Sequence, residues 1–128
     1  MQDSCAQACS DAGTKIGLPE LQLGIIPGFG GTQRLPRLVG LQQGLMMMLT
    51  SSPLKASAAL GAGLVDAVVA PAQLLPKAKM MALDMANFKA PRKITINDTS
   101  KIGALGEAEP IIAFARAEAV KRAGVHCN

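Results

Sequence analysis

The sequence has no tryptophan or tyrosine, and its 128 residues include only three phenylalanines. Proteins that bind single-stranded nucleic acid stack bases on aromatic side chains, and this chain offers almost none. Clustered charge is missing as well: 13 Lys and Arg and 9 Asp and Glu are scattered along the chain, with a net charge of +4. The composition therefore argues against a nucleic-acid-binding module.

Long apolar runs and targeting signals are also missing. A membrane-spanning helix needs about 20 consecutive apolar residues, and the longest run here, Leu45 to Leu49, is far shorter. The chain does not start with a basic stretch followed by an apolar block, as a secretory signal does. Its last residues, 126–128, do not form a Ser-Lys-Leu peroxisomal address. We therefore expect no membrane span, and a cytoplasmic location if the chain is expressed alone.

Cysteine and histidine are scarce. Cys5, Cys9 and Cys127 are an odd number, and the only histidine, His126, lies at the end of the chain. Zinc sites and disulfide frameworks need these residues at characteristic spacings, which are not found here. We therefore expect free thiols and no metal site.

The chain does have apolar residues: 49% of it is hydrophobic, against 17% charged. This is enough for one core of aliphatic side chains and methionine. The pattern predicts a mostly helical α/β protein with short strands near residues 15–18 and 64–69. Helical spacing predicts helices over residues 32–39, 41–49, 55–60, 71–88 and 107–122.

Three details of these helices are further expectations. Pro36 is expected near the start of its helix, where a missing N–H costs least. The Met-rich face of helix 71–88 is expected to lie in the core. Helix 107–122 is expected to have Ile111, Ile112, Phe114 and Ala115 on one side.

The most informative segment, residues 17–35, reads GLPELQLGIIPGFGGTQRL. It sets one carboxylate, Glu20, among apolar residues ahead of a glycine-rich turn. Pro19 restricts Leu18 to extended geometry, which predicts Glu20 at the end of a short strand. A positioned carboxylate can accept a proton from water and return one to carbon, as the addition of water to an activated double bond requires. Glu20 is therefore the candidate acid/base residue.

Two other interpretations compete for this segment. Most glutamates beside an apolar run are simply solvated. The glycines could cradle a phosphate ahead of a helix, but Gln33 stands where a dinucleotide-binding loop has its third glycine. No Gly-Lys-Ser or Gly-Lys-Thr follows, as a Walker-type loop requires. A nucleotide-binding fold is therefore not expected.

The segment resembles the second catalytic segment of the crotonase superfamily, best known from enoyl-CoA hydratases. The resemblance implies a partial crotonase-like (β-β-α) fold, with Glu20 as the catalytic acid/base and the backbone N–H of Gly28 holding the water that adds to the double bond. It also implies an acyl-CoA thioester as substrate and no further cofactor. The matching residues are Pro19, Glu20, Leu23, Gly24, Ile26, Pro27, Gly28, Gly30, Gly31, Thr32, Gln33, Arg34 and Leu35.

The similarity extends over most of the chain. Its tail, from about residue 98, looks like the region that joins the hydratase domain to the 3-hydroxyacyl-CoA dehydrogenase part in plant-type peroxisomal multifunctional proteins of fatty acid β-oxidation. The resemblance implies that residues 13–89 are the C-terminal half of a crotonase-like domain, and that residues 90–128 are a linker and a helix leading to a dehydrogenase domain. Residues 1–12 have no assignment. A peroxisomal location follows from the same resemblance, and a generic basic helix is the alternative for the tail.

Two parts of the active site that the resemblance implies have no match in this sequence. In the family, the oxyanion hole and a second catalytic glutamate precede the segment that contains Glu20. Residues 1–19 offer only Asp3 and Asp11 as carboxylates, and residues 6–11 show no apolar strand pattern. We therefore expect no hydratase activity from this chain alone. The alternative is a non-catalytic remnant that acts only through packing or through association with a complete crotonase-type subunit, and its exposed apolar surface would favour aggregation or a partner.

Overall fold

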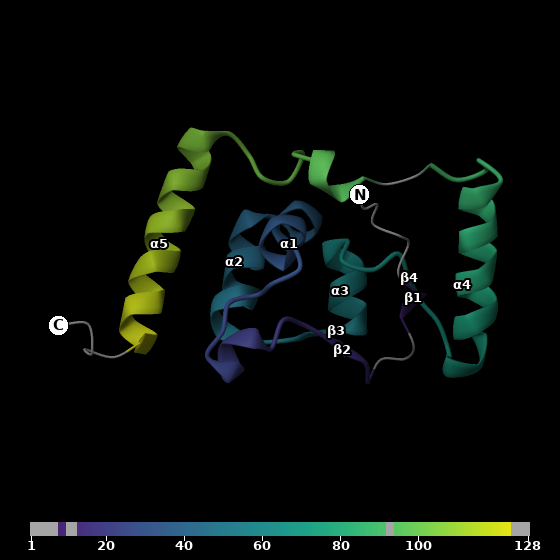
Figure 1. Ribbon diagram of the computed structural model, residues 1–128, viewed down its shortest axis with the longest axis horizontal. Helices are drawn as coiled ribbons and strands as arrows, with labels where there is room; N and C mark the ends of the chain where they lie inside the picture. Colours follow the sequence, from purple (N-terminus) through teal and green to yellow (C-terminus); the bar gives the residue numbers. More distant parts are fainter. Residues whose placement is uncertain (1–7, 10–12, 92–93, 124–128) are drawn as a thin grey trace.

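The computed structural model describes residues 8–9, 13–91 and 94–123. In the described part three short helices lie in the middle, and two long helices, α4 and α5, lie at opposite ends (Figure 1). The helices are η1 (Glu20–Leu23), α1 (Gly31–Val39), α2 (Leu41–Thr50), α3 (Ala56–Ala62), α4 (Pro71–Ala86), η2 (Thr95–Asn97) and α5 (Leu105–Ala123), where η denotes a 3-10 helix. The mostly helical architecture is confirmed, and Lys55 lies before α3 and not in it.

The described strands are two residues long and form two small sheets. β1 (Ala8–Cys9) pairs with β4 (Ala67–Val68) in parallel, and β2 (Lys15–Ile16) pairs with β3 (Leu54–Lys55) in antiparallel register. The two expected strands are confirmed in place, although each is shorter than expected. β1 corrects the expectation that residues 6–11 form no strand, because pairing with a segment about 60 residues away has no local apolar signature.

Pro36 lies inside α1, so the expectation that it is near the helix start is wrong. The proline is buried where α1 meets α2. A Cβ on Gly44 of α2 would lie only 2.9 Å from the Cα of Pro36. Because glycine has no Cβ, α2 can approach the backbone of α1 at this point, and the close contact offsets part of the cost of an internal proline.

Two buried clusters form the core of the described part. The first lies between α1 and α2, and the second joins α3 to Val65, which lies between α3 and β4. Leu54 and Leu64 pack against both clusters and link them. The buried members are Leu35, Val39, Met47 and Met48 in the first cluster and Ala56, Ala59 and Val65 in the second.

The expectation that α4 lies in the core is wrong, since α4 has no buried residue. Leu75 is 63% exposed, Leu83 60% and Met80 47%. The helix contacts β1 at one end of the molecule (Figure 1). Its amphipathic pattern therefore predicts the helix correctly but not the packing of its apolar face.

α5 packs on α2 mainly through small residues. Ala108 and Ala115 are buried, one helical repeat of seven residues apart. Ile112 and Phe114 were expected on the same side as Ala115, but both are exposed. The buried residues of α5 that the structure describes are therefore alanines, and Ile112 and Phe114 lie outside the contact.

The segment before α5, residues 94–102, is held against the central helices. Nε of Arg37 on α1 donates a hydrogen bond to the carbonyl oxygen of Ile96 (3.1 Å). The hydroxyl of Ser100 donates to Oδ1 of Asp98 (2.6 Å) and holds the pKa of that carboxyl below its usual range. The stretch expected to act as a linker is thus ordered by contacts with α1 and by its own turn.

Lys101 joins two helix ends to this segment. Its Nζ donates to the carbonyl oxygens of Leu38 (2.7 Å) and Ala62 (2.9 Å), at the C-terminal ends of α1 and α3. A cation is favourable there because the free carbonyls give these ends partial negative charge.

We predict that Lys101→Met lowers the free energy of unfolding by about 1–2 kcal/mol, because it removes two hydrogen bonds from a charged donor at a solvent-exposed site. Urea unfolding followed by far-UV circular dichroism measures the change. The control is Lys79→Met, since Lys79 is exposed on α4 and makes no hydrogen bond or ion pair within the described part. Equal losses in the two variants would contradict the role given to Lys101.

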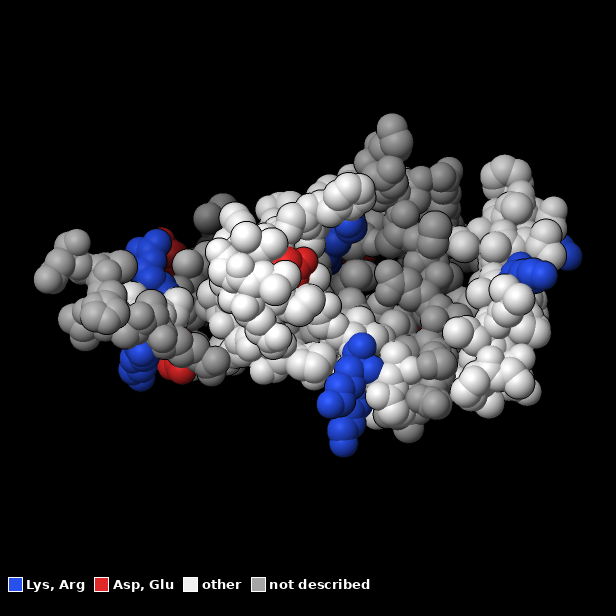
Figure 2. Space-filling model, turned by 60° about the horizontal axis from the view of Figure 1, so that its bottom comes forward, with Lys and Arg blue, Asp and Glu red and all other residues white. Residues whose placement is uncertain are grey.

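Basic side chains do not form one large patch on the face that Figure 2 shows. On the face shown in Figure 2, Lys and Arg lie in separate places with uncharged surface between them. Among the described helices, none combines the length and apolar character that a membrane span requires. No group of three or more His, Cys, Asp or Glu that could hold a metal ion occurs among the described residues. Cys5, Cys127 and His126 lie outside the described residues, as do Asp3 and Asp11.

Candidate functional site

Glu20 is the first residue of η1, which corrects the expectation of a strand end. The turn closes on itself: the N–H of Gln22 donates to the carbonyl of Pro19 (2.9 Å), and the N–H of Ile25 donates to the carbonyl of Glu20 (3.2 Å). Pro19 can begin such a turn because its own missing N–H is not needed there. The short helix therefore fixes the backbone from which the carboxylate projects.

The carboxylate of Glu20 is only partly hydrated. Its Oε2 is shielded from solvent and has no hydrogen-bond partner within the described residues. A buried polar atom without a partner costs about 1–3 kcal/mol, and more when it is charged. Such atoms are rare in native structures, and the reasons for them include backbone strain, a bound water molecule or ion, and a role in a reaction. The hydroxyls of Ser51 and Thr95 are similarly unpaired, but they are neutral and cannot act as bases.

Gly28 lies in the loop between η1 and α1. Its carbonyl accepts a hydrogen bond from the N–H of Gly31 (3.0 Å), which ties the loop to the start of the helix. The amide of Gly28 donates no hydrogen bond within the described part of the chain. A Cβ on this residue would meet no atom within 4 Å. The amide is therefore a free donor in open surroundings, able to bind a water molecule or an anion.

Glu20 and Gly28 belong to one continuous turn, residues 19–30, although no hydrogen bond joins them. The same turn borders an apolar cavity of about 320 Å³ between η1, α1 and α2. Leu21, next to Glu20, lines the cavity together with Ile26 and Met48. The lining is almost entirely hydrocarbon, so the cavity can accept an alkyl group.

A second cavity, of about 600 Å³, lies between α2 and α5. Its lining includes Gln42, Lys101 and Glu107 but none of the residues predicted from the sequence as catalytic. Of these two cavities, the apolar one is bordered by the turn that contains Glu20 and Gly28.

The turn also exposes an apolar surface. Phe29 is 97% exposed, Ile26 77%, Leu23 73% and Ile25 56%. Contiguous apolar surface of this kind is typical of a site that binds another protein or a ligand.

Sequence reasoning missed one residue that binds this turn from α1. Arg34 was noted only as part of the motif, yet its Nη2 donates to the carbonyl oxygen of Phe29 (2.6 Å). The signal that could have found it is its spacing, because an arginine in the first turn of a helix can reach back over the loop that precedes it.

Comparison with known proteins agrees with this fold. Residues 4–100 match the family described as enoyl-CoA hydratase/isomerase. Over 120 residues the chain is 51% identical to the peroxisomal fatty acid beta-oxidation multifunctional protein MFP2 of Arabidopsis thaliana. It is 50% identical over 119 residues to the glyoxysomal fatty acid beta-oxidation multifunctional protein MFP-a of Cucumis sativus. These matches cover 94% and 93% of this chain but only 17% and 16% of the relatives.

A solved structure agrees at the level of the fold. The crystal structure of an enoyl-CoA hydratase from Geobacillus kaustophilus superposes with a TM-score of 0.61 at 32% identity. The match covers 88% of this chain and 44% of that protein, so the partial crotonase-like fold expected from the sequence is confirmed. The family match, the identity to the plant proteins and the shared fold show that this chain belongs to the enoyl-CoA hydratase/isomerase family.

Proposed function

We propose that this chain provides part of an enoyl-CoA hydratase or isomerase site of fatty acid β-oxidation, with Glu20 as the catalytic acid/base. The observation that supports the proposal is the buried, unpaired Oε2 of Glu20. The next residue, Leu21, lines an apolar cavity. Such a carboxylate has a free acceptor position for a proton from water, and the cavity offers room for the alkyl part of an acyl thioester. The proposed location is the peroxisome, because the Arabidopsis relative is named as a peroxisomal protein.

The proposed hydration step uses both residues of the turn. The N–H of Gly28 binds the oxygen of a water molecule, and Glu20 accepts a proton from it. The water oxygen forms a bond to the alkene carbon farther from the thioester, and the π electrons move toward the carbonyl. The carbon next to the carbonyl then receives a proton from the acid form of Glu20 or from a second acid. The CoA thioester is the substrate, and the reaction needs no further cofactor.

We also propose that the groups in this chain do not suffice for turnover. The negative charge that develops on the thioester oxygen needs donors, and each missing donor costs on the order of 10²–10³ in rate. Apart from Glu20, the buried and unpaired side-chain atoms of the described part are hydroxyls. No second carboxylate of this kind accompanies Glu20 there.

The test places this chain where the rest of a hydratase domain is present. In a chimera, the chain replaces the matching 120-residue stretch of the Arabidopsis relative. We expect the chimera to hydrate crotonyl-CoA, seen as loss of the enoyl thioester absorbance, and the chain alone to be no faster than buffer. An inactive chimera that retains the thermal transition of its host would contradict the proposed function. Turnover by the chain alone would contradict its proposed insufficiency.

A second candidate function is association without catalysis, as a remnant that packs on a complete crotonase-type subunit. The exposed apolar turn, with Phe29 97% exposed, favours it. The chimera separates the two candidates, because a remnant selected only for packing has no reason to retain a working acid/base geometry.

A further inference from the structure

The backbone around Gly28 has a conformation that its own residues do not favour. Phe29 has φ of 52° and Gly30 has φ of 82°, so two successive residues are left-handed. The left-handed conformation costs a residue with a side chain about 1–2 kcal/mol. The side chain of Phe29 is almost fully exposed and cannot offset this cost by packing within the described part. Another group must therefore hold the loop.

Arg34 is that group. From the first turn of α1, its Nη2 donates to the carbonyl oxygen of Phe29 at 2.6 Å. The guanidinium also lies over the next residue, since a Cβ on Gly30 would be 2.9 Å from Nη1. The backbone N–H of Arg34 donates to the carbonyl oxygen of Gly30 at 2.9 Å. One residue thus binds two consecutive carbonyls of the loop, one with its side chain and one with its backbone.

We propose that Arg34 is a positioning residue, which holds the left-handed Phe29–Gly30 backbone and so fixes the direction of the free Gly28 amide. The inference rests on the proposed function, in which that amide holds the attacking water. The loop has no other side-chain hydrogen bond from the described residues. Without the guanidinium, the loop relaxes toward ordinary backbone angles and the amide turns away from its position.

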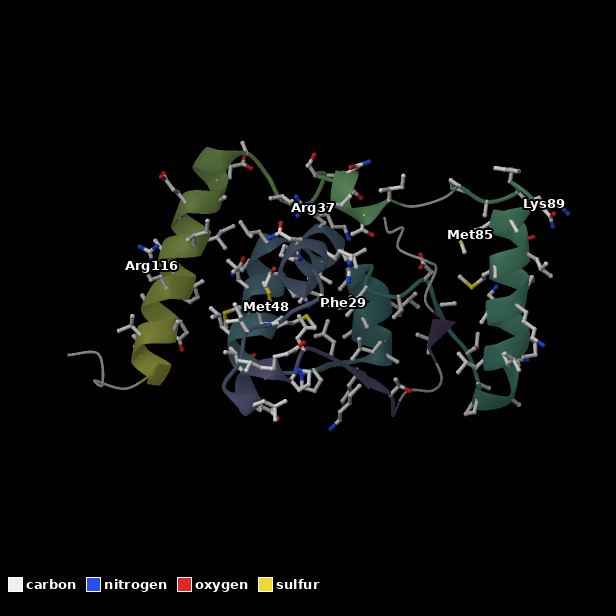
Figure 3. All side chains as sticks on the ribbon, viewed as in Figure 1. Phe29, Arg37, Met48, Met85, Lys89 and Arg116 are labelled. Carbon is white, nitrogen blue, oxygen red and sulfur yellow. The ribbon has the colours of Figure 1, made fainter. Side chains whose placement is uncertain are left out.

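Arg37 provides a matched comparison on the same helix. It also donates to carbonyl oxygens, those of Gln33 and Ile96. It lies beside η2 and away from Phe29 (Figure 3). Arg37→Met therefore shows what the loss of any arginine hydrogen bond from α1 does to the loop. Arg34→Met shows what the loss of the arginine that binds the loop does.

The test measures backbone order in the full chain by 15N relaxation. Arg34→Met keeps the aliphatic stem and removes the donors. We expect the order parameters of Gly28, Phe29 and Gly30 to fall from about 0.85 to below about 0.6, while those of α1 and α2 stay unchanged. Arg34→Lys offers a single ammonium group in place of a planar fork and should give intermediate values. Arg37→Met should leave the loop amides at their wild-type values.

A loop in Arg34→Met that stays as rigid as in the wild-type chain overturns the proposal. A loss of order spread equally over α1 and α2 also overturns it, because that shows a general structural role. If Arg34→Met does not fold, the same measurement is made on Arg34→Lys. A loop as rigid in Arg34→Lys as in the wild-type chain then overturns the proposal. None of these results requires catalytic activity, so the inference and the proposed function can fail separately.

Discussion

Glu20→Gln in the chimera is expected to slow crotonyl-CoA hydration by about 10²- to 10⁴-fold, the usual contribution of a general acid/base. Glutamine keeps the size of the side chain and its place in η1 but cannot accept a proton from water at neutral pH. The loss should appear mainly in kcat, because Glu20 moves protons in the reaction and does not hold the bulk of the substrate. Initial rates over a range of crotonyl-CoA concentrations separate kcat from KM.

The matched control for this prediction is Glu109→Gln. Glu109 is exposed on α5 and makes no hydrogen bond or ion pair within the described residues, so its removal should leave the rate unchanged. Thermal unfolding should be similar in both variants, which separates loss of chemistry from loss of fold. If Glu20→Gln retains more than about a tenth of the wild-type rate, Glu20 is not the acid/base and the proposed mechanism is wrong.

Met47→Ala is expected to lower the free energy of unfolding by about 2–5 kcal/mol, the range for truncating a buried large aliphatic side chain to alanine. Met47 is 4% exposed and belongs to the cluster between α1 and α2. The loss combines removed apolar burial with the cavity left behind, and it is a large part of the 5–15 kcal/mol, roughly, that stabilises a typical domain. Urea unfolding followed by circular dichroism measures it.

Met80→Ala is the matched control, since Met80 lies on α4 and is 47% exposed. The same atoms are removed, but little burial is lost and no closed cavity forms, so the expected change is below about 1 kcal/mol. Figure 3 shows the contrast between the two regions, with Met48 on α2 among the central helices and Met85 on α4 at the end of the molecule. Similar losses at Met47 and Met80 would show that α4 is as well packed as the core.

The losses expected for Glu20→Gln and for Met47→Ala arise in different parts of the structure formed by η1, α1 and α2. The Met47 cluster supports the packing of α1 against α2, and Met48 of that cluster also lines the apolar cavity. Glu20 is not part of the cavity lining, although the residue after it, Leu21, is. Met47→Ala should therefore disturb stability first, whereas Glu20→Gln should disturb only the reaction.

Local patterns in the sequence predicted the helices well. The stretches 32–39 and 41–49 agree with α1 and α2 to within one residue, because helical spacing and the glycine between them are short-range signals. The helix predicted over 71–88 is also present as α4. The candidate site could be found for the same reason, since Glu20 and Gly28 belong to one uninterrupted motif.

Predictions of which segments pack against each other in the fold were less successful. The apolar face of α4 is open, Phe114 lies outside the contact between α5 and α2, and β1 exists only through pairing with β4. Each depends on which segment lies opposite, and a periodic pattern contains no such information. Amphipathic spacing shows that a helix has an apolar face but not what covers it.

The sequence by itself determined the family of this protein, the order of its helices and the identity of its candidate acid/base. A long ordered motif and local periodicity are properties of the chain alone. Only the tertiary structure decided that Oε2 of Glu20 is buried without a partner within the described residues, that Leu21 lines an apolar cavity and that Arg34 reaches back to the carbonyl of Phe29. These features arise because solvent exclusion and hydrogen-bond geometry depend on how η1, α1 and α2 pack together in space.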